Sequence, residues 1–189
     1  MILKVVMNPY LSVVNQKLFF CNLLLKQGGA GKSEKPHSEQ SGIKSGTRLN
    51  TQLEQALCQS ALYQLEAAYG FYLREIAATY QFKSPESVTS AESLAEALSS
   101  INKHPAEAQE ILILLGQTNS WLSQLLKAYK CLLTIQSPSA TSPVSNSPIS
   151  IVEVKQLDDL ESLGYELLLE WHKAFMEMVN RHRELMFEC

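Results

Sequence analysis

The sequence lacks the features by which several large classes of protein are recognised. Charged residues make up 19% of its 189 residues and the net charge is only −3, so no basic excess is present to hold a polyanion such as DNA. The longest apolar run near the start, Leu18 to Leu25, is far shorter than the 20 or so residues that a membrane-spanning helix needs. We therefore expect a cytoplasmic protein without a membrane span and without nucleic acid as a partner.

Cysteine is scarce and poorly placed for chemistry. The cysteines are Cys21, Cys58, Cys131 and Cys189, and no two of them have the short spacing of a zinc or redox motif. The first three stand among apolar residues at helical positions, where a reduced thiol behaves as a small hydrophobic group. This pattern predicts free cysteines in a reducing compartment.

Motifs for catalysis and cofactor binding are missing as well. There is no GxSxG elbow, and neither His172 nor His182 follows a glutamate at the ExxH spacing of a di-iron bundle. The stretch GGAGKS at 28–33 looks like a phosphate-binding loop, but Lys26 stands where that motif has its first glycine and helical periodicity precedes it. We predict no catalytic residue, no cofactor and no metal, and we expect that the protein is not an enzyme.

The sequence does contain apolar stripes at helical spacing. The first opens at Asn8 and Pro9, a favourable cap and first-turn pair, and repeats every three or four residues as far as Leu25. The second contains Gly70, which we expect to let a neighbouring helix approach closely. Besides the helix that opens at Asn8, the predicted helices are 47–80, 89–100, 105–134 and 158–187.

Two segments of different composition separate these helices. Residues 28–46 are nearly free of large apolar side chains and residues 136–150 are rich in serine and proline, so we expect flexible loops in both. No alternation typical of strands is present. Because each helix must bury one stripe against the others, we predict a single all-α domain over 1–189, an antiparallel bundle of four long helices plus one short helix.

Four residues stand out as candidate contacts for a ligand or a partner. His182 falls on the apolar stripe of the last helix, where a buried imidazole either binds a metal, moves a proton, or simply bonds to a neighbour in the core. Trp121, Tyr129 and Trp171 are aromatic residues of the kind that anchor protein interfaces. His172, beside Trp171, is expected to face solvent.

Two functions from different classes remain open, and a third, binding of an anion or a membrane surface by the basic amino-terminal region, ranks last because its lysines form no single basic face. The absence of catalytic motifs and the long stripes favour a non-catalytic protein–protein interaction or scaffold protein, which binds a protein partner or self-associates as a homodimer. The alternative is a bundle that binds a small ligand or a metal in its interior around His182. The tyrosines at 63, 69, 72 and 80 would be polar contacts in the second case, although helical spacing predicts packing residues first.

Three stretches resemble a known family: NQKLFF at 15–20, SALYQLEAAYGFYLREIA at 60–77 and SWLSQLLKAY at 120–129. Together they are similar to a domain-of-unknown-function family of small all-helical proteins from Pseudomonas and related gammaproteobacteria. The resemblance covers the predicted helices and not the two loops. It implies a bacterial, cytoplasmic, helical protein, and it brings no activity, cofactor or catalytic residue with it.

Overall fold

The computed structural model describes residues 8–30, 45–134 and 163–187, and in these ranges it holds helices and no strand. None of the helices described combines the length and the apolar character that crossing a membrane requires. The all-α class is therefore confirmed. The elements are α1 (Pro9–Ala30), α2 (Ser45–Thr79), the 3-10 turn η1 (Pro85–Ser87), α3 (Ala91–Ser99), α4 (Ala106–Gly116), α5 (Trp121–Leu133) and α7 (Tyr165–Phe187).

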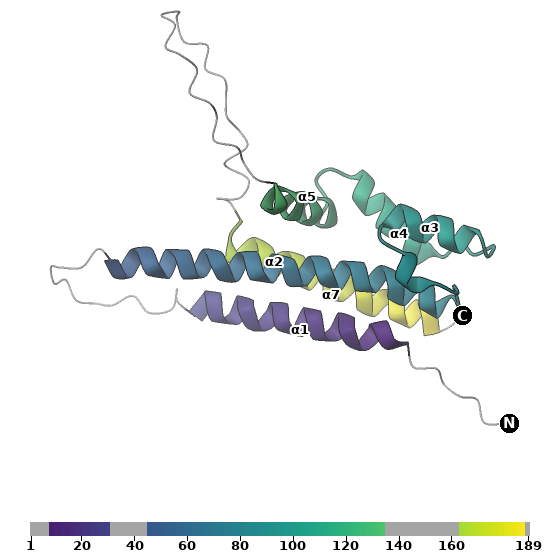
Figure 1. The fold of residues 1–189 in the computed structure, drawn as a ribbon, viewed down its shortest axis with the longest axis horizontal. Helices are drawn as coiled ribbons and strands as arrows, with labels where there is room; N and C mark the ends of the chain where they lie inside the picture. Colours follow the sequence, from purple (N-terminus) through teal and green to yellow (C-terminus); the bar gives the residue numbers. More distant parts are fainter. Residues whose placement is uncertain (1–7, 31–44, 135–162, 188–189) are drawn as a thin grey trace, which may run out of the picture.

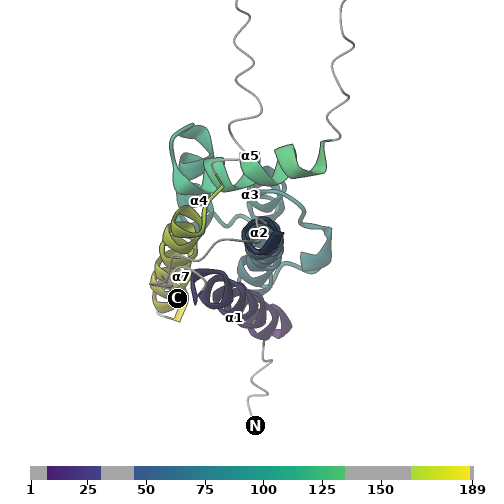
Figure 2. The ribbon, with the colours of Figure 1, turned by 90° about the vertical axis from the view of Figure 1, so that its left-hand side faces the viewer.

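Three long helices lie side by side (Figure 1). Helix α1 runs antiparallel to both α2 and α7, and it packs most extensively on α2. The view along these helices in Figure 2 places α5 across α2, on the side opposite α1. Helix α2 therefore occupies the centre of the molecule, between α1 and the layer of shorter helices.

The start of α1 follows the predicted capping chemistry. The Asn8 side-chain oxygen accepts the Tyr10 backbone N–H at 3.1 Å, which satisfies one of the free donors of the first turn. The amide nitrogen of the same side chain donates to the Glu75 carbonyl oxygen at 2.8 Å and to the Thr79 hydroxyl at 3.0 Å. Asn8 thus caps α1 and also ties its first turn to the last turns of α2.

The hydrophobic core lies where α2 meets the other helices. The stripe predicted on α2 is confirmed, because Leu62, Leu65, Tyr72 and Ile76 are fully buried. Burial of each such side chain contributes about 1.5–3 kcal/mol, so this one face supplies much of the drive to fold. Other core residues come from α1, α3, α4, α5 and α7, among them Val14, Cys21, Leu25, Leu94, Leu98, Ile111, Leu122, Leu125, Leu168 and Phe175.

The prediction of one helix over 105–134 is wrong. Helix α4 ends at Gly116, and α5 begins after Ser120, whose hydroxyl accepts the Ser123 backbone N–H at 3.1 Å. The same hydroxyl donates to the Leu114 carbonyl, so one side chain satisfies both helix ends. The break lets α5 turn across α2. The described residues accordingly form three long and three short α-helices, not four long helices and one short one.

The predicted loops and the predicted role of Gly70 also need correction. Helix α1 continues to Ala30 and α2 begins at Ser45, so both ends of the predicted loop 28–46 are helical. The remainder of that loop, the loop 136–150 and residues 158–162 of the last predicted helix lie outside the described residues. No atom lies within 4 Å of a Cβ built on Gly70, so no close helix approach occurs there.

A close approach occurs instead at Gly29. A Cβ built on Gly29 would lie 2.7 Å from the Tyr165 ring, well inside van der Waals contact. A Cβ at this position would force the end of the Tyr165 side chain to move, so the last turn of α1 and the first turn of α7 are in close contact here. The glycine-rich stretch that looks like a phosphate-binding loop therefore begins as helix, at a helix–helix contact.

Candidate functional site

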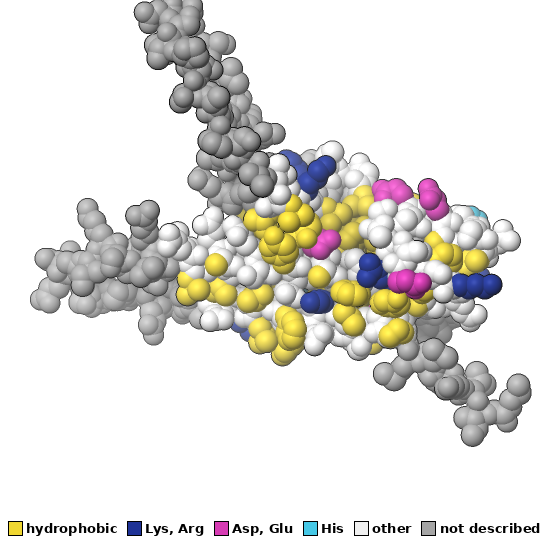
Figure 3. All heavy atoms as spheres, viewed as in Figure 1, with side chains coloured by type: hydrophobic (Ala, Val, Ile, Leu, Met, Phe, Trp, Pro, Cys, Tyr) yellow, Lys and Arg dark blue, Asp and Glu magenta, His cyan; other side chains and the backbone are white. Residues whose placement is uncertain are grey.

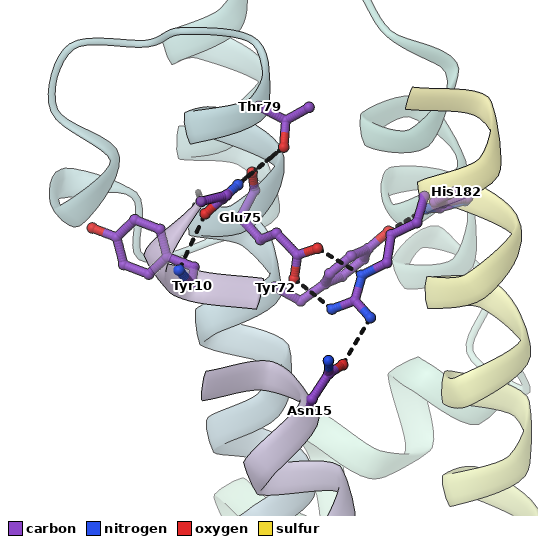
Figure 4. Close-up of polar contacts among 8 residues, drawn as sticks. Tyr10, Asn15, Tyr72, Glu75, Thr79 and His182 are labelled. Carbon is purple, nitrogen blue, oxygen red and sulfur yellow. Dashed lines mark hydrogen bonds and ion pairs between the residues drawn. The ribbon is translucent and has the colours of Figure 1, made fainter. Parts of the chain in front are cut away.

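A polar network lies where α1 begins and where α2 and α7 end (Figure 4). Tyr72, Glu75 and Thr79 are three and four residues apart, so all three lie on one face of α2. His182 and Arg183 face them from α7. Polar side chains are unusual in such a buried position, which makes this network the first candidate for a functional site.

An ion pair between Glu75 and Arg183 is one half of the network. The Arg183 Nε lies 2.7 Å from one carboxylate oxygen and its Nη2 lies 2.8 Å from the other, a bidentate arrangement. The remaining nitrogen, Nη1, donates to the Asn15 side-chain oxygen of α1 at 2.8 Å. Glu75 is only 1% exposed. The pair therefore joins α1, α2 and α7 through charges that are almost entirely removed from water.

The other half is a chain of hydrogen bonds through His182, which is fully buried as its place on the apolar stripe suggests. Its Nδ1 lies 2.7 Å from the Tyr72 hydroxyl, and its Nε2 lies 2.9 Å from a carboxylate oxygen of Glu110 on α4. A carboxylate accepts, so Nε2–H donates to Glu110, and Nδ1 shares a hydrogen bond with the Tyr72 hydroxyl. The second oxygen of Glu110 binds Arg181.

The order tyrosine, histidine, carboxylate is the order of a nucleophile, a base and an orienting group. Burial, reinforced by the negative charge of Glu75, raises the pKa of the Tyr72 hydroxyl above its usual range, so this hydroxyl stays protonated at neutral pH. The Tyr72 side chain is also fully buried. In this series of hydrogen-bonded side chains, only Glu110 and Arg181 reach solvent. A substrate has no access to the hydroxyl in this arrangement. The geometry suits holding α2, α4 and α7 together.

An interior metal at His182 finds no ligand set. Both ring nitrogens already take part in hydrogen bonds, so neither offers a free lone pair. Over the three described ranges, no group of three or more His, Cys, Asp and Glu side chains is placed to hold a metal ion.

The other predicted contact residues do not gather around His182. Trp121 is half-buried, and its ring centre lies 5.6 Å from that of Phe175. Tyr129, also half-buried, meets the ring of Tyr63 edge-on at 5.3 Å. Trp171 is 4% exposed and borders a hollow of about 240 Å³ between α5 and the start of α7. The four residues are therefore distributed along the bundle as packing residues.

The prediction that His172 faces solvent is wrong. Its side chain is buried, and its Nε2 donates to the Leu18 carbonyl oxygen of α1 at 3.0 Å. Helix α1 covers this face of α7, and the Leu18 carbonyl offers the buried ring an acceptor. His172 thus joins α1 to α7 about three turns of α7 away from Arg183.

Sequence reasoning missed Glu75, Glu110 and Arg183 as members of the network. The available signal was the presence of Glu75 and Arg183 directly beside stripe residues, since a charge at the edge of an apolar stripe is a candidate for burial. Their pairing carries no local signature, because Glu75 and Arg183 are 108 positions apart.

Comparison with known proteins agrees with the resemblance noted in the sequence. A model of DUF6586, a family of unknown function, matches residues 7–189. No curated protein and no solved structure matches the chain.

Proposed function

Because the chain belongs to the DUF6586 family, whose function is unknown, we propose a function from the structure: a non-catalytic interaction protein that self-associates through helix α1. The observation that carries this proposal is that α1 is apolar on two opposite faces. The buried Tyr72 hydroxyl, which no substrate can reach, supports a role without catalysis.

One face of α1 is used within the protein. Val14, Leu18, Cys21 and Leu25 recur every three or four residues, and all four are buried against the rest of the bundle. This face accounts for the contacts of α1 with α2 and α7.

The opposite face, which we name the outer α1 face, consists of Phe19, Phe20 and Leu23. All three side chains are exposed, and Phe19 is the most exposed of them at 57%. In Figure 3 several groups of hydrophobic side chains are visible along the part of the surface that α1 forms. A helix that is apolar all round is normally covered on all sides, and contiguous exposed apolar surface marks an interaction site.

A second copy of this chain fits the outer α1 face. Helix α1 has no acidic residue, and Phe19 and Phe20 lie at the middle of its 22 residues. A two-fold axis near Cys21 would bring Phe19 opposite Leu23 of the second copy, so the apolar patch is complementary to itself. In this antiparallel arrangement Lys17 and Lys26 each stay more than about 10 Å along the axis from their own copies, whereas Lys17 of one copy lies about level with Lys26 of the other.

Sedimentation equilibrium of the full chain over a range of concentrations tests the proposal. We expect the protein to dimerise and the variant Phe19→Asp/Leu23→Asp to remain monomeric with an unchanged helical circular dichroism spectrum. The matched control is Ile113→Asp/Leu133→Asp, which places the same two charges on exposed apolar residues of α4 and α5 and should leave the dimer intact.

A wild-type protein that stays monomeric at all concentrations, or a dimer that survives the double substitution, would overturn the proposal. Flotation with vesicles containing anionic lipid provides the competing result. A monomer that binds such vesicles through Phe19 and Leu23 would assign the outer α1 face to a membrane surface instead.

A further inference from the structure

A second feature, away from the outer α1 face, is an open hollow of about 490 Å³ at one end of the bundle. It lies between the end of α2, the turn that joins α3 to α4, the first turn of α4 and Leu185 of α7. Its polar lining groups are Tyr80, Lys103, His104 and Glu107, and Pro105 and Leu185 contribute apolar surface.

Two helix-ending motifs hold these groups in place. At the end of α2 the Phe82 N–H donates to the Ala77 carbonyl at 2.9 Å, and at the end of α3 the Lys103 N–H donates to the Leu98 carbonyl at 2.9 Å. Each bond closes a Schellman motif, the common turn that ends an α-helix. The left-handed residue of the motif is Gln81 after α2 and Asn102 after α3. Tyr80 and Lys103 therefore project from backbone that is tied down, as a preformed site requires.

Glu107 is the most informative lining residue. Its side chain is 3% exposed, and the Tyr80 hydroxyl donates to its Oε2 at 3.1 Å. Among the residues that the structure describes, the Tyr80 hydroxyl bonds this carboxylate and no cation pairs with it. Burial of an ionised carboxylate costs free energy unless the carboxylate is paired. Glu107 lies in the first turn of α4, where the helix dipole offsets only part of that cost.

The charges around the hollow are arranged by sign. The negative group, Glu107, is buried, whereas the side chains of Lys103 and His104 are exposed. A ligand that fits both carries a cation for Glu107 and an anion for Lys103. Apolar surface from Pro105 and Leu185 would accept an aliphatic group.

We propose that this hollow binds a small zwitterion of the amino-acid class with an aliphatic side chain. Its ammonium group donates to Glu107, supplying the cation that the buried carboxylate lacks, and its carboxylate pairs with Lys103. Charge-assisted hydrogen bonds of this kind are about twice as strong as neutral ones, so both charged ends contribute to affinity. The inference rests on the hollow and does not depend on the proposed role of α1.

Isothermal titration of the full chain with L-leucine tests this proposal, alongside the other standard amino acids. Two matched probes each keep only one of the charged groups of leucine: 3-methylbutylamine lacks the carboxylate and 4-methylpentanoate lacks the ammonium group. We expect saturable binding of L-leucine or another aliphatic amino acid, and at least about 10-fold weaker binding of both probes. Backbone amide shifts in NMR spectra should change at 103–107.

Variants then assign the two ends of the ligand. Glu107→Gln should weaken binding of the amino acid at least about 10-fold and should preserve the fold, because the amide has the same shape. Lys103→Gln, an exposed substitution, should weaken binding of the amino acid but leave the weak binding of 3-methylbutylamine unchanged. Glu96→Gln, on the exposed side of α3, is the control and should have no effect.

The proposal is overturned if none of the amino acids binds saturably at concentrations up to 10 mM. A dissociation constant of 10 mM corresponds to a binding free energy of about 2.7 kcal/mol in magnitude. It is also overturned if the amine alone binds as tightly as the amino acid, or if Glu107→Gln leaves the affinity unchanged.

Discussion

At the scale of the residue, the buried Glu75–Arg183 pair is the most consequential contact of the fold. The Glu75 side chain is 2% exposed and that of Arg183 is 16% exposed, and each satisfies the other through two hydrogen bonds. Such a pair contributes little net stability compared with apolar residues of the same size, yet the loss of one partner is severe. Its effect is to fix the register of α7 against α2 and, through Asn15, against α1.

Replacement of Arg183 by Met should destabilise the protein by about 3–5 kcal/mol, because the Glu75 carboxylate would remain buried without a partner. The double variant Glu75→Gln/Arg183→Met should recover much of that loss. Urea denaturation followed by circular dichroism measures both. Arg181→Met, two residues earlier on α7, is the matched control: Arg181 is 54% exposed, so its loss should cost less than about 1 kcal/mol. Equal losses for the two arginines would contradict this assignment.

His172 makes stability depend on pH. Burial lowers the pKa of its imidazole below the ordinary 6.5, although the bond to the Leu18 carbonyl acts in the opposite direction. The unfolded chain therefore takes up the proton at a higher pH than the folded chain does. The contribution of His172 is fully present above pH 6.5 and is lost as the pH falls through the lowered folded value.

Urea denaturation at pH 7, 6 and 5 should accordingly show a smaller loss of stability for His172→Gln than for the wild type. The glutamine amide retains a donor for the Leu18 carbonyl but does not titrate. His104→Gln, an exposed substitution, is the control and should follow the wild-type slope. A slope unchanged by His172→Gln would show that the ring is protonated as readily in the folded protein as in the unfolded chain.

At the scale of the element, the ends of the helices decide how they are arranged. Helix α2 ends at Thr79, and Gln81 then adopts a left-handed conformation with φ 62°. Glycine usually occupies this position, since an L-residue there costs roughly 1–2 kcal/mol. The strain lies at the point where the chain leaves α2 for the short helices.

Gln81→Gly should therefore stabilise the protein by about 0.5–1 kcal/mol, after the entropy that glycine adds to the unfolded chain is subtracted. A thermal melt should show a rise of a few degrees. Gln52→Gly places the same substitution within the regular, exposed part of α2 and should destabilise by about 1 kcal/mol. If both variants lower the melting temperature, relief of backbone strain at Gln81 is not the dominant effect.

Which elements could be predicted depends on how local their determinants are. The start of α1 was correct because an Asn-Pro pair carries its own capping chemistry. The break between α4 and α5 was missed because Leu114 and Trp121 are seven residues apart, so the apolar spacing continues across it. The Ser120 hydroxyl that closes both helices acts through a contact that only the folded chain forms.

The candidate site was predictable to a smaller extent. The position of His182 on an apolar stripe indicated its burial, which the structure confirms. Its partners are separated from it by 110 and 72 positions, so neither Tyr72 nor Glu110 could be identified without the tertiary arrangement. His172 was placed wrongly for the same reason, because the helix that covers it is remote in the sequence.

At the scale of the whole molecule, two groups of helices meet along α2 and α7. The long helices α1, α2 and α7 form one group, and α3, α4 and α5 cover the other side of α2 (Figure 2). The side chain of Glu110 is a principal polar link between them, since it binds both His182 and Arg181 of α7. The packing of Trp121 on Phe175 joins the same groups through apolar contact.

Loss of this link should loosen one group more than the other. Glu110→Ala leaves the buried Nε2–H of His182 without an acceptor, which should cost about 1–3 kcal/mol. Amide hydrogen exchange should then accelerate in α4 while α1, held by Asn8, Asn15 and His172, keeps its protection. Glu110→Gln retains an oxygen that can accept from His182 and should restore most of the protection. Acceleration of equal size in α1 and α4 would mean that the two groups unfold as one cooperative unit.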